Sequence, residues 1–171
     1  MSDTMSVTLT VNGSQRSLLV RPDQRLLDPL REQLGLFSVR DGCSVGICGS
    51  CTVLLNGQAV SSCLTLAALC QRAEVLTAEG LSSGVELDRV AQAFVDHRAF
   101  QCSYCTPGFI LAMKGLLAST PRPDRGEIEA CLRGHLCRCG SYSRILAAAM
   151  DVASVDPAHG NRPRVPLGER P

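Results

Sequence analysis

The stretch Cys43-Ser-Val-Gly-Ile-Cys48-Gly-Ser-Cys51 places three cysteines on one short segment, and Cys63 follows after eleven further residues. The spacing C-x4-C-x2-C followed by a distant cysteine is the plant-type pattern of a [2Fe–2S] cluster. Glycines alternate with these cysteines. A loop around a cluster must direct several backbone N–H groups at sulfur, often with positive φ, and glycine adopts such conformations without a Cβ clash. The stretch therefore predicts a cluster-binding loop to which Cys63 returns.

The composition indicates a globular chain with no nucleic-acid partner. Of its 171 residues, 45% are hydrophobic and 19% are charged, which is enough apolar content for one domain or two small ones. The formal net charge is +1, aromatic residues make up 4%, and tryptophan is absent. The chain thus lacks the broad basic field and the base-stacking aromatics that nucleic-acid binding requires.

Ten cysteines raise the alternative of a secreted disulfide scaffold. Residues 1–10 are polar and carry no signal-peptide core, and no run approaches the roughly 18 apolar residues of a membrane span. The cysteines also cluster at ligand-like intervals. We therefore expect a cytoplasmic protein that binds a metal or a cluster and has no membrane span.

The first half predicts two hairpins and one helix. Residues 7–11 alternate apolar and polar side chains, Asn12-Gly13 is a strong hairpin signal, and residues 18–20 supply the return strand. The apolar spacing over residues 26–34 predicts a short helix, because Pro29 is tolerated in a first turn and Gly35 is typical of a C-terminal cap.

The second hairpin follows the cluster loop. Residues 52–55 and 58–62 flank Asn56-Gly57 and deliver Cys63 back to the loop, and residues 74–77 predict a closing strand. This order suggests a small mixed sheet crossed by one helix, which is compatible with a β-grasp fold.

The second half changes to a helical period. Residues 88–100 and 109–118 predict helices, Asp124 and Glu127 have capping-box spacing, and Ser141 stands where it could cap a last helix. We expect an α+β protein with an N-terminal β-grasp ferredoxin-like domain and a C-terminal four-helix bundle domain. The predicted boundaries are residues 1–78 for the first domain, 79–86 for a linker, 87–155 for the second domain and 156–171 for an extended or disordered tail rich in proline and arginine.

A second cysteine set lies in the helical half. Cys102 and Cys105 form a C-x2-C pair, and Cys137 and Cys139 form a C-x-C pair after thirty-one residues. Each pair falls in a predicted helix–helix connection, and two such connections can meet at one end of a bundle. A zinc site with four cysteines is the alternative, although two C-x2-C pairs about fifteen to twenty residues apart are its usual pattern.

Through its two four-cysteine sets and the residues around them, the chain resembles the small iron–sulfur subunit of the molybdenum hydroxylases. This group includes xanthine dehydrogenase, aldehyde oxidoreductase and aerobic carbon monoxide dehydrogenase. The matching phrases are Asp41-Gly-Cys-Ser-Val-Gly-Ile-Cys-Gly-Ser-Cys-Thr-Val-Leu, Ser62-Cys-Leu, Gln101-Cys-Ser-Tyr-Cys-Thr-Pro-Gly-Phe-Ile and Leu136-Cys-Arg-Cys-Gly. The family often has Cys-Arg-Cys-Thr-Gly-Tyr where this chain has Cys-Arg-Cys139-Gly-Ser-Tyr142.

The resemblance implies two [2Fe–2S] clusters in series and no catalytic residue in this chain. A large partner subunit would hold a molybdopterin-type molybdenum cofactor, and a medium subunit, where one exists, would hold FAD. Gln101 and Cys139 would contact the molybdopterin. The variant at Cys139–Tyr142 resembles members that act on aldehydes or N-heteroaromatic compounds. The implied ligands are Cys43, Cys48, Cys51 and Cys63 for the first cluster and Cys102, Cys105, Cys137 and Cys139 for the second.

Two other functions stay open at this stage. A non-redox adaptor would hold zinc at two structural four-cysteine sites. A free-standing ferredoxin-like shuttle would keep the clusters but have no permanent partner. The two remaining cysteines, Cys70 and Cys131, lie among apolar residues and are expected to pack in the core.

Overall fold

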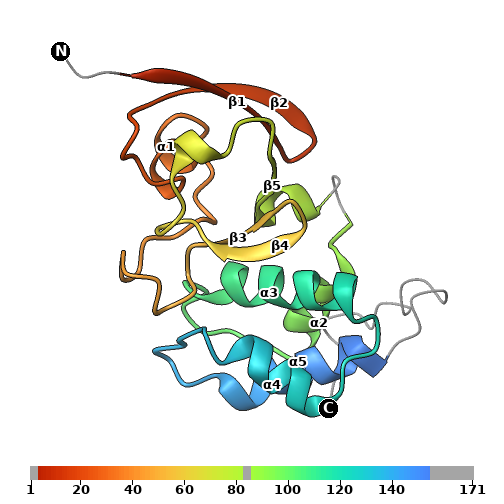
Figure 1. The fold of residues 1–171 in the computed structure, drawn as a ribbon. Coiled ribbons are helices and arrows are strands. Elements are labelled where there is room, and N and C mark those ends of the chain that lie inside the picture. The colour runs from red at the N-terminus through yellow and green to blue at the C-terminus, as the bar shows by residue number, and fades with distance from the viewer. Residues whose placement is uncertain (1–3, 83–85, 155–171) are drawn as a thin grey trace.

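The computed structural model describes residues 4–82 and 86–154, and Figure 1 shows a strand-rich first half followed by helices. The tail predicted for residues 156–171 and residues 83–85 of the predicted linker lie outside this description. The elements are β1 (Met5–Val11), β2 (Ser14–Val20), α1 (Leu27–Glu32), β3 (Thr52–Leu55), β4 (Gln58–Ser61), β5 (Glu74–Leu76), α2 (Arg89–Asp96), α3 (Thr106–Ser119), α4 (Arg125–Leu132), α5 (Tyr142–Ser154) and the 3-10 turns η1 (Ala67–Leu69) and η2 (Ala78–Leu81).

The strands form one mixed sheet in the order β2-β1-β5-β3-β4. β1 pairs with β5 in parallel, and every other pairing is antiparallel. Both predicted hairpins are present, because Asn12-Gly13 and Asn56-Gly57 adopt the positive φ angles that two-residue hairpin turns require. The α+β class with a mixed sheet is confirmed.

The first core lies between the sheet and α1. Alternating residues of β1 and β2, including Leu9 and Val20, are buried against Leu30 of α1. Pro29 occupies the first turn of α1, where its missing N–H has no partner to lose. Gly35 has φ +67° and its N–H donates to the Arg31 carbonyl, so it ends the helix as predicted.

The second core is made by the four helices α2 to α5. Phe94, Phe109, Met113 and Ile128 are fully buried in it. The helix expected over residues 88–100 is shorter than predicted, because α2 ends at Asp96. The helix ends there because Arg98 adopts a left-handed backbone conformation, with φ +48°. The chain then turns toward Cys102.

α3 joins the two cores. In Figure 1 it runs between the β3–β4 hairpin and the remaining helices. Leu54 is buried on the face of β3 that meets α3, and a Cβ on Gly115 of α3 would lie 3.1 Å from the Leu54 Cδ2 atom. A helix buried on several sides needs apolar residues around much of its circumference, which explains its nearly continuous hydrophobic sequence.

Of the two predicted helix caps one is realised, and the structure adds a third cap that was not predicted, at Asp88. Asp124 and Glu127 form a reciprocal capping box at α4, and the Asp88 carboxylate accepts from the Val90 N–H at the start of α2. Ser141 precedes α5, and its carbonyl accepts from the Ile145 N–H at 3.0 Å. The Ser141 hydroxyl, however, has no hydrogen-bond partner, so the predicted side-chain cap of α5 is wrong.

Within residues 4–82 and 86–154, no helix combines the length and apolar character needed to cross a membrane.

Candidate metal centres

The first cysteine set is gathered by the loop between α1 and β3 and by the segment after β4. Thr52 pairs with Ser61 at the open end of the β3–β4 hairpin. The Ser62 N–H donates to the Cys51 carbonyl at 3.4 Å, which returns the chain to the loop. The four cysteines brought to this place are Cys43, Cys48, Cys51 and Cys63.

Backbone donors converge on the sulfur of Cys43. The N–H groups of Val45, Cys48 and Ile47 lie 3.5, 3.4 and 3.3 Å from Cys43 Sγ. They lower the pKa of Cys43 to about 7, which favours the thiolate, the form in which cysteine binds metals. The loop is thus arranged to stabilise negative charge on sulfur.

The opposite shift occurs at Cys63. Burial, together with the neighbouring Cys51 thiol, raises the pKa of Cys63 to about 11. Two thiols packed together in a partly buried place cannot both ionise readily unless a cation compensates their charge. A bound iron would supply that charge, because a coordinating thiol is deprotonated by its metal.

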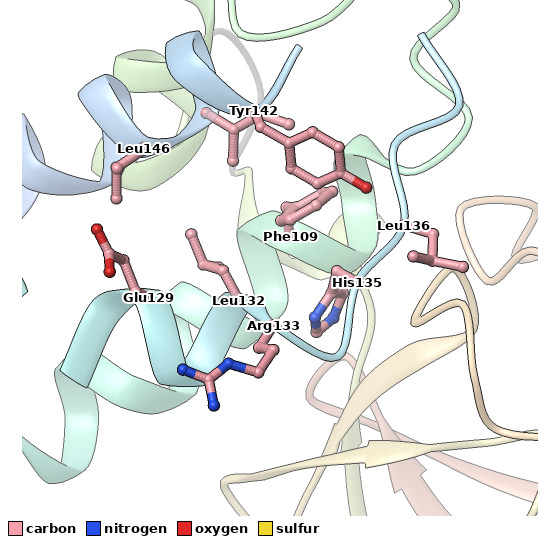
Figure 2. A pocket seen from close by; sticks show the side chains of 9 residues that line it. Phe109, Glu129, Leu132, Arg133, His135, Leu136, Tyr142 and Leu146 are labelled. Atoms are coloured by element: carbon pink, nitrogen blue, oxygen red, sulfur yellow. The ribbon is translucent and has the colours of Figure 1, made fainter. Parts of the chain in front are cut away.

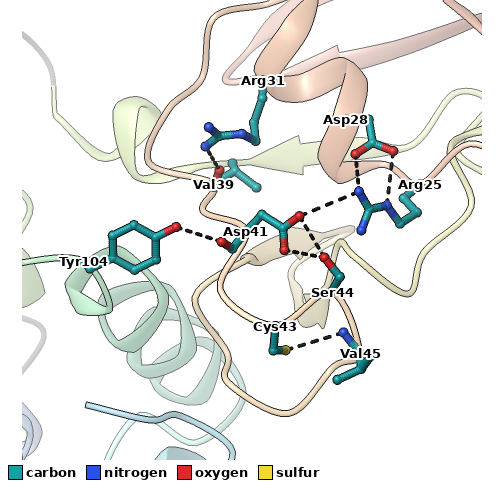
Figure 3. Close-up of polar contacts among 9 residues, drawn as sticks. All are labelled: Arg25, Asp28, Arg31, Val39, Asp41, Cys43, Ser44, Val45 and Tyr104. Carbon is teal, nitrogen blue, oxygen red and sulfur yellow. Dashed lines mark hydrogen bonds and ion pairs between the residues drawn. The ribbon is translucent and has the colours of Figure 1, made fainter. Parts of the chain in front are cut away.

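The loop conformation depends on positive φ angles at Ser44 (+56°), Gly46 (+75°) and Gly49 (+70°). Ser44 tolerates this because its hydroxyl donates to the Asp41 carboxylate at 2.6 Å (Figure 3). Gly46 has no room for a side chain, since a Cβ there would lie 2.3 Å from Leu64 Cδ1. The glycines between the cysteines are therefore required by the backbone and by close packing.

Figure 3 also shows how the loop is anchored to the first domain. Arg25 pairs with Asp28 at 2.7 Å and reaches Asp41 at 3.7 Å. The Tyr104 hydroxyl, from the helical half, donates to the Asp41 carbonyl at 2.8 Å. Asp41 thus links the loop both to α1 and to the segment that carries the second cysteine set.

The second cysteine set lies where two helix connections meet. Cys102 and Cys105 stand between α2 and α3, and Cys137 and Cys139 stand between α4 and α5. Burial, followed by the nearby Cys137 thiol, raises the pKa of Cys105 to about 12. The Tyr104 N–H, with help from Cys139, lowers the pKa of Cys102.

The thiols of each set lie close enough to influence one another. In the first set Cys43 interacts with Cys48, and Cys63 interacts with Cys51 and with Cys43. In the second set Cys102 interacts with Cys139 and Cys137, and Cys105 interacts with Cys137 and Cys102. Four thiols gathered in this way are the donor set that a [2Fe–2S] cluster needs.

Unpartnered buried polar atoms surround the second set. Among the described residues, the buried side-chain atoms without a hydrogen bond are Thr106 Oγ1, His135 Nδ1 and Ser141 Oγ. Thr106 follows Cys105 directly, and the other two flank the Cys137–Cys139 segment. Buried polar groups are normally paired, so their concentration here fits a site that receives another group.

The two cysteine sets are in direct contact through backbone and a histidine. The Leu136 N–H donates to the Cys48 carbonyl at 3.0 Å. His135 lies against Gly49, and its Nε2 is 3.1 Å from the Thr52 hydroxyl. Burial lowers the pKa of His135 to about 4, so it is neutral at pH 7. No spacing in the sequence indicated this contact of His135 with the first loop.

The outer side of the second set is open to solvent. Gln101 is exposed and its Nε2 donates to the Cys139 carbonyl at 3.1 Å. Cys102 is exposed and Cys139 is half-buried, whereas Cys105 and Cys137 are buried. The two residues expected to contact molybdopterin, Gln101 and Cys139, therefore lie side by side on an accessible face.

An apolar pocket of about 360 Å³ lies beside the second set, between α4 and α5 (Figure 2). Phe109 and Tyr142 contribute rings to its wall, and Leu136 is half exposed at its edge. A second exposed apolar group surrounds the first loop, where Val45, Ile47 and Leu64 are each about three-fifths exposed. We call these three residues the apolar collar. Leu64 packs on Gly46, which lies between Val45 and Ile47 in the loop.

Comparison with known proteins matches both halves of the chain to iron–sulfur domains. Residues 9–81 match a 2Fe-2S iron-sulfur cluster binding domain, and residues 77–150 match a [2Fe-2S] binding domain. The small FeS subunit of nicotinate dehydrogenase from Eubacterium barkeri is 44% identical over 144 residues, which cover 84% of this chain and 92% of that protein. The aldehyde oxidoreductase iron-sulfur-binding subunit of Escherichia coli is 42% identical, with 87% and 72% covered.

Solved structures agree with this assignment. A chain of quinoline 2-oxidoreductase from Pseudomonas putida 86 superposes with a TM-score of 0.84 at 41% identity, covering 89% of this chain and 94% of that one. The aldehyde oxidoreductase of Desulfovibrio desulfuricans superposes with a TM-score of 0.82 at 40% identity, and the match covers 86% of this chain but 17% of that longer one. The chain therefore belongs to the family of small iron–sulfur subunits of molybdenum hydroxylases, the group of xanthine dehydrogenase and aldehyde oxidoreductase.

Proposed function

We propose that this chain is an electron relay between a molybdenum site in a large partner subunit and a flavin or other acceptor. It performs no bond-making chemistry on substrate; its residues bind, orient and tune the clusters. In this proposal the first cluster is held by Cys43, Cys48, Cys51 and Cys63, and the second by Cys102, Cys105, Cys137 and Cys139.

The observation that carries the proposal is the contact between the two cysteine sets. The Leu136–Cys48 hydrogen bond joins the residue before Cys137 to a cysteine of the first set. A short chain of covalent bonds and one hydrogen bond therefore runs from one set to the other. Such proximity serves one-electron transfer between centres and has no evident purpose for two separate structural zinc ions.

The face around Gln101 and Cys139 suits the electron-donating partner. Gln101 already donates one hydrogen bond to the Cys139 backbone and remains exposed, so its amide oxygen is available to a partner. A pterin offers ring N–H groups that pair with such an amide. The apolar pocket beside this face, and the exposed Leu136 at its edge, supply the docking area expected on the helical half.

The apolar collar suits the electron-accepting partner. Val45 and Ile47 lie on the first cluster loop itself, next to the exposed side of Cys43. Exposed apolar groups around a redox centre favour a lasting subunit interface over the transient encounters of a shuttle, which form small interfaces. The collar therefore supports a permanent complex, with FAD in the accepting subunit.

The substrate class is proposed from the relatives. Their names refer to nicotinate, quinoline and aldehydes. The Gly140-Ser141 variant after Cys139 agrees with that group. We propose oxidation or hydroxylation of an aldehyde or an N-heteroaromatic compound at the partner's molybdenum site.

The test is elemental analysis of the anaerobically purified chain, combined with co-purification. We expect about four iron and four acid-labile sulfide per chain, no zinc, and a molybdenum-containing subunit retained on the tagged chain. Zinc without sulfide would establish the structural adaptor instead. Full iron content with a chain that stays alone under all expression conditions would favour the free shuttle.

A further inference from the structure

The hydroxyl of Ser141 is buried, unpartnered and adjacent to a cysteine of the second set. Ser141 is 4% exposed, and its own N–H donates to Cys137 Sγ at 3.4 Å. A serine directly before a helix normally accepts a hydrogen bond from the first turn. This one does not, because its Oγ has no partner among the described residues. The helix therefore makes no use of the hydroxyl.

We infer that the Ser141 hydroxyl donates a hydrogen bond to the Cys137 sulfur when the second cluster is bound, and that it raises the reduction potential of that cluster. The inference rests on the proposed function, because it requires a cluster at Cys102, Cys105, Cys137 and Cys139.

The surroundings leave sulfur as the natural acceptor. The Ser141 N–H already donates to Cys137 Sγ at 3.4 Å, so this serine lies directly beside the sulfur. An unpaired buried hydroxyl costs free energy, and a thiolate bound to iron offers it a charged acceptor.

The direction of the effect follows from charge. Reduction adds one negative charge to the cluster and its thiolates, so a donor at sulfur stabilises the reduced state more than the oxidised state.

The experiment is a redox titration of the full chain with its clusters, followed by EPR, in Ser141→Ala, Ser141→Thr and wild-type forms. Cys43→Ala and Cys102→Ala variants assign which signal belongs to which cluster. In Ser141→Ala we expect the equilibrium constant for reduction of the second cluster to fall about tenfold, which is ~59 mV for one electron. The first cluster should keep its potential, and Ser141→Thr should restore the second.

Ser154→Ala is the matched control, because Ser154 lies at the other end of α5 and its hydroxyl donates to the Asp151 carbonyl. It should shift neither cluster. Unchanged potential in Ser141→Ala, or an equal shift of both clusters, would overturn the inference while leaving the relay intact. Failure of wild-type chain to hold a second cluster would instead overturn the proposed function.

A second measurement covers the case in which Ser141→Ala loads poorly. Pulsed EPR of the reduced wild-type chain in H₂O and D₂O reports exchangeable protons near the second cluster. We expect one more strongly coupled exchangeable proton in wild type and Ser141→Thr than in Ser141→Gly, and identical spectra would count against the hydrogen bond.

Discussion

The Leu136 N–H donates to the Cys48 carbonyl across 3.0 Å, and this bond joins two loops that are 88 residues apart in sequence. Around it, His135 fills the space between Gly49 and Phe109, with its ring centroid 5.1 Å from that of Phe109. A Cβ on Gly49 would lie 2.4 Å from the Cδ2 atom of His135, so there is no room for a side chain at Gly49. The separation of the two cysteine sets is thus held by this main-chain bond and by the packing of His135, together with the Tyr104–Asp41 hydrogen bond.

This close approach predicts a sharp response at Gly108. A Cβ there would lie 2.2 Å from the Gly49 carbonyl oxygen, which belongs to the first cluster loop. We expect Gly108→Ala to lower the free energy of unfolding by about 1–3 kcal/mol, since overpacking against backbone forces the loops apart. Chemical denaturation measures the loss, and EPR of the fully reduced chain should show weaker magnetic interaction between the clusters.

Gly134→Ala is the control for that variant, because no atom lies within 4 Å of a Cβ built at Gly134. It should leave both the unfolding free energy and the magnetic interaction unchanged. Equal behaviour of the two alanine variants would mean that the Gly108–Gly49 contact does not set the separation of the loops.

Removal of single cysteines should empty one site at a time. Cys102 is exposed, so Cys102→Ala removes a thiol with little loss of packing. We expect iron to fall from about four to about two per chain, with the EPR signal of the first cluster retained. Cys131→Ala, which removes a partly buried thiol that packs against the helical core, should keep all the iron. Loss of iron in both variants would instead indicate a general failure to fold.

The junction between the two halves should respond to acid through Glu79. Burial by itself would raise the pKa of Glu79, but hydrogen bonds from the Ser38 hydroxyl and N–H and from Thr77 make the net shift downward. A carboxylate with a lowered pKa stabilises the fold above its unfolded value, near 4.5, and loses that contribution as the pH falls below it.

Glu79→Gln should therefore lower the unfolding free energy at pH 7 by about 1 kcal/mol, with the difference from wild type shrinking below pH 4.5. Urea titrations of both proteins at pH 7 and pH 4 measure this. Glu74→Gln, on the exposed side of β5, serves as the control. A Glu79 difference that stays constant with pH would show that the carboxylate charge contributes nothing.

The local features of the fold could be predicted from sequence. Asn12-Gly13 and Asn56-Gly57 specify their hairpins by turn chemistry alone, and the Asp124–Glu127 spacing specifies its capping box. The end of α1 at Gly35 could be predicted as well, because the glycine and the Arg31 carbonyl to which its N–H donates lie four residues apart. In each of these cases the residue that specifies the feature and its partner are close in sequence. The gathering of each cysteine set also followed from the positions of the elements around it.

The features that were missed depend on distant partners. His135 bonds to Thr52, 83 residues away, and no spacing in the sequence indicates that contact. Ser141 has the residue type and the position of a helix cap, yet its hydroxyl makes no hydrogen bond to the first turn of α5. Its N–H donates instead to the sulfur of Cys137, a contact that local sequence does not indicate. α2 ends early because the chain must turn toward Cys102. Local propensity could not anticipate any of the three.

The apolar collar predicts where the accepting partner docks. Ile47 is 64% exposed on the first cluster loop, and its N–H, not its side chain, contacts Cys43. Ile47→Lys therefore leaves the cluster contacts in place but puts a charge into an interface core, which costs binding because a lysine there must be desolvated. We expect at least a tenfold loss of association with the accepting subunit, measured by co-purification and by titration of separated subunits. The chain should keep its iron content and both EPR signals. Leu19→Lys, at an equally exposed position on β2, should bind as wild type does; equal loss in both variants would place the interface elsewhere.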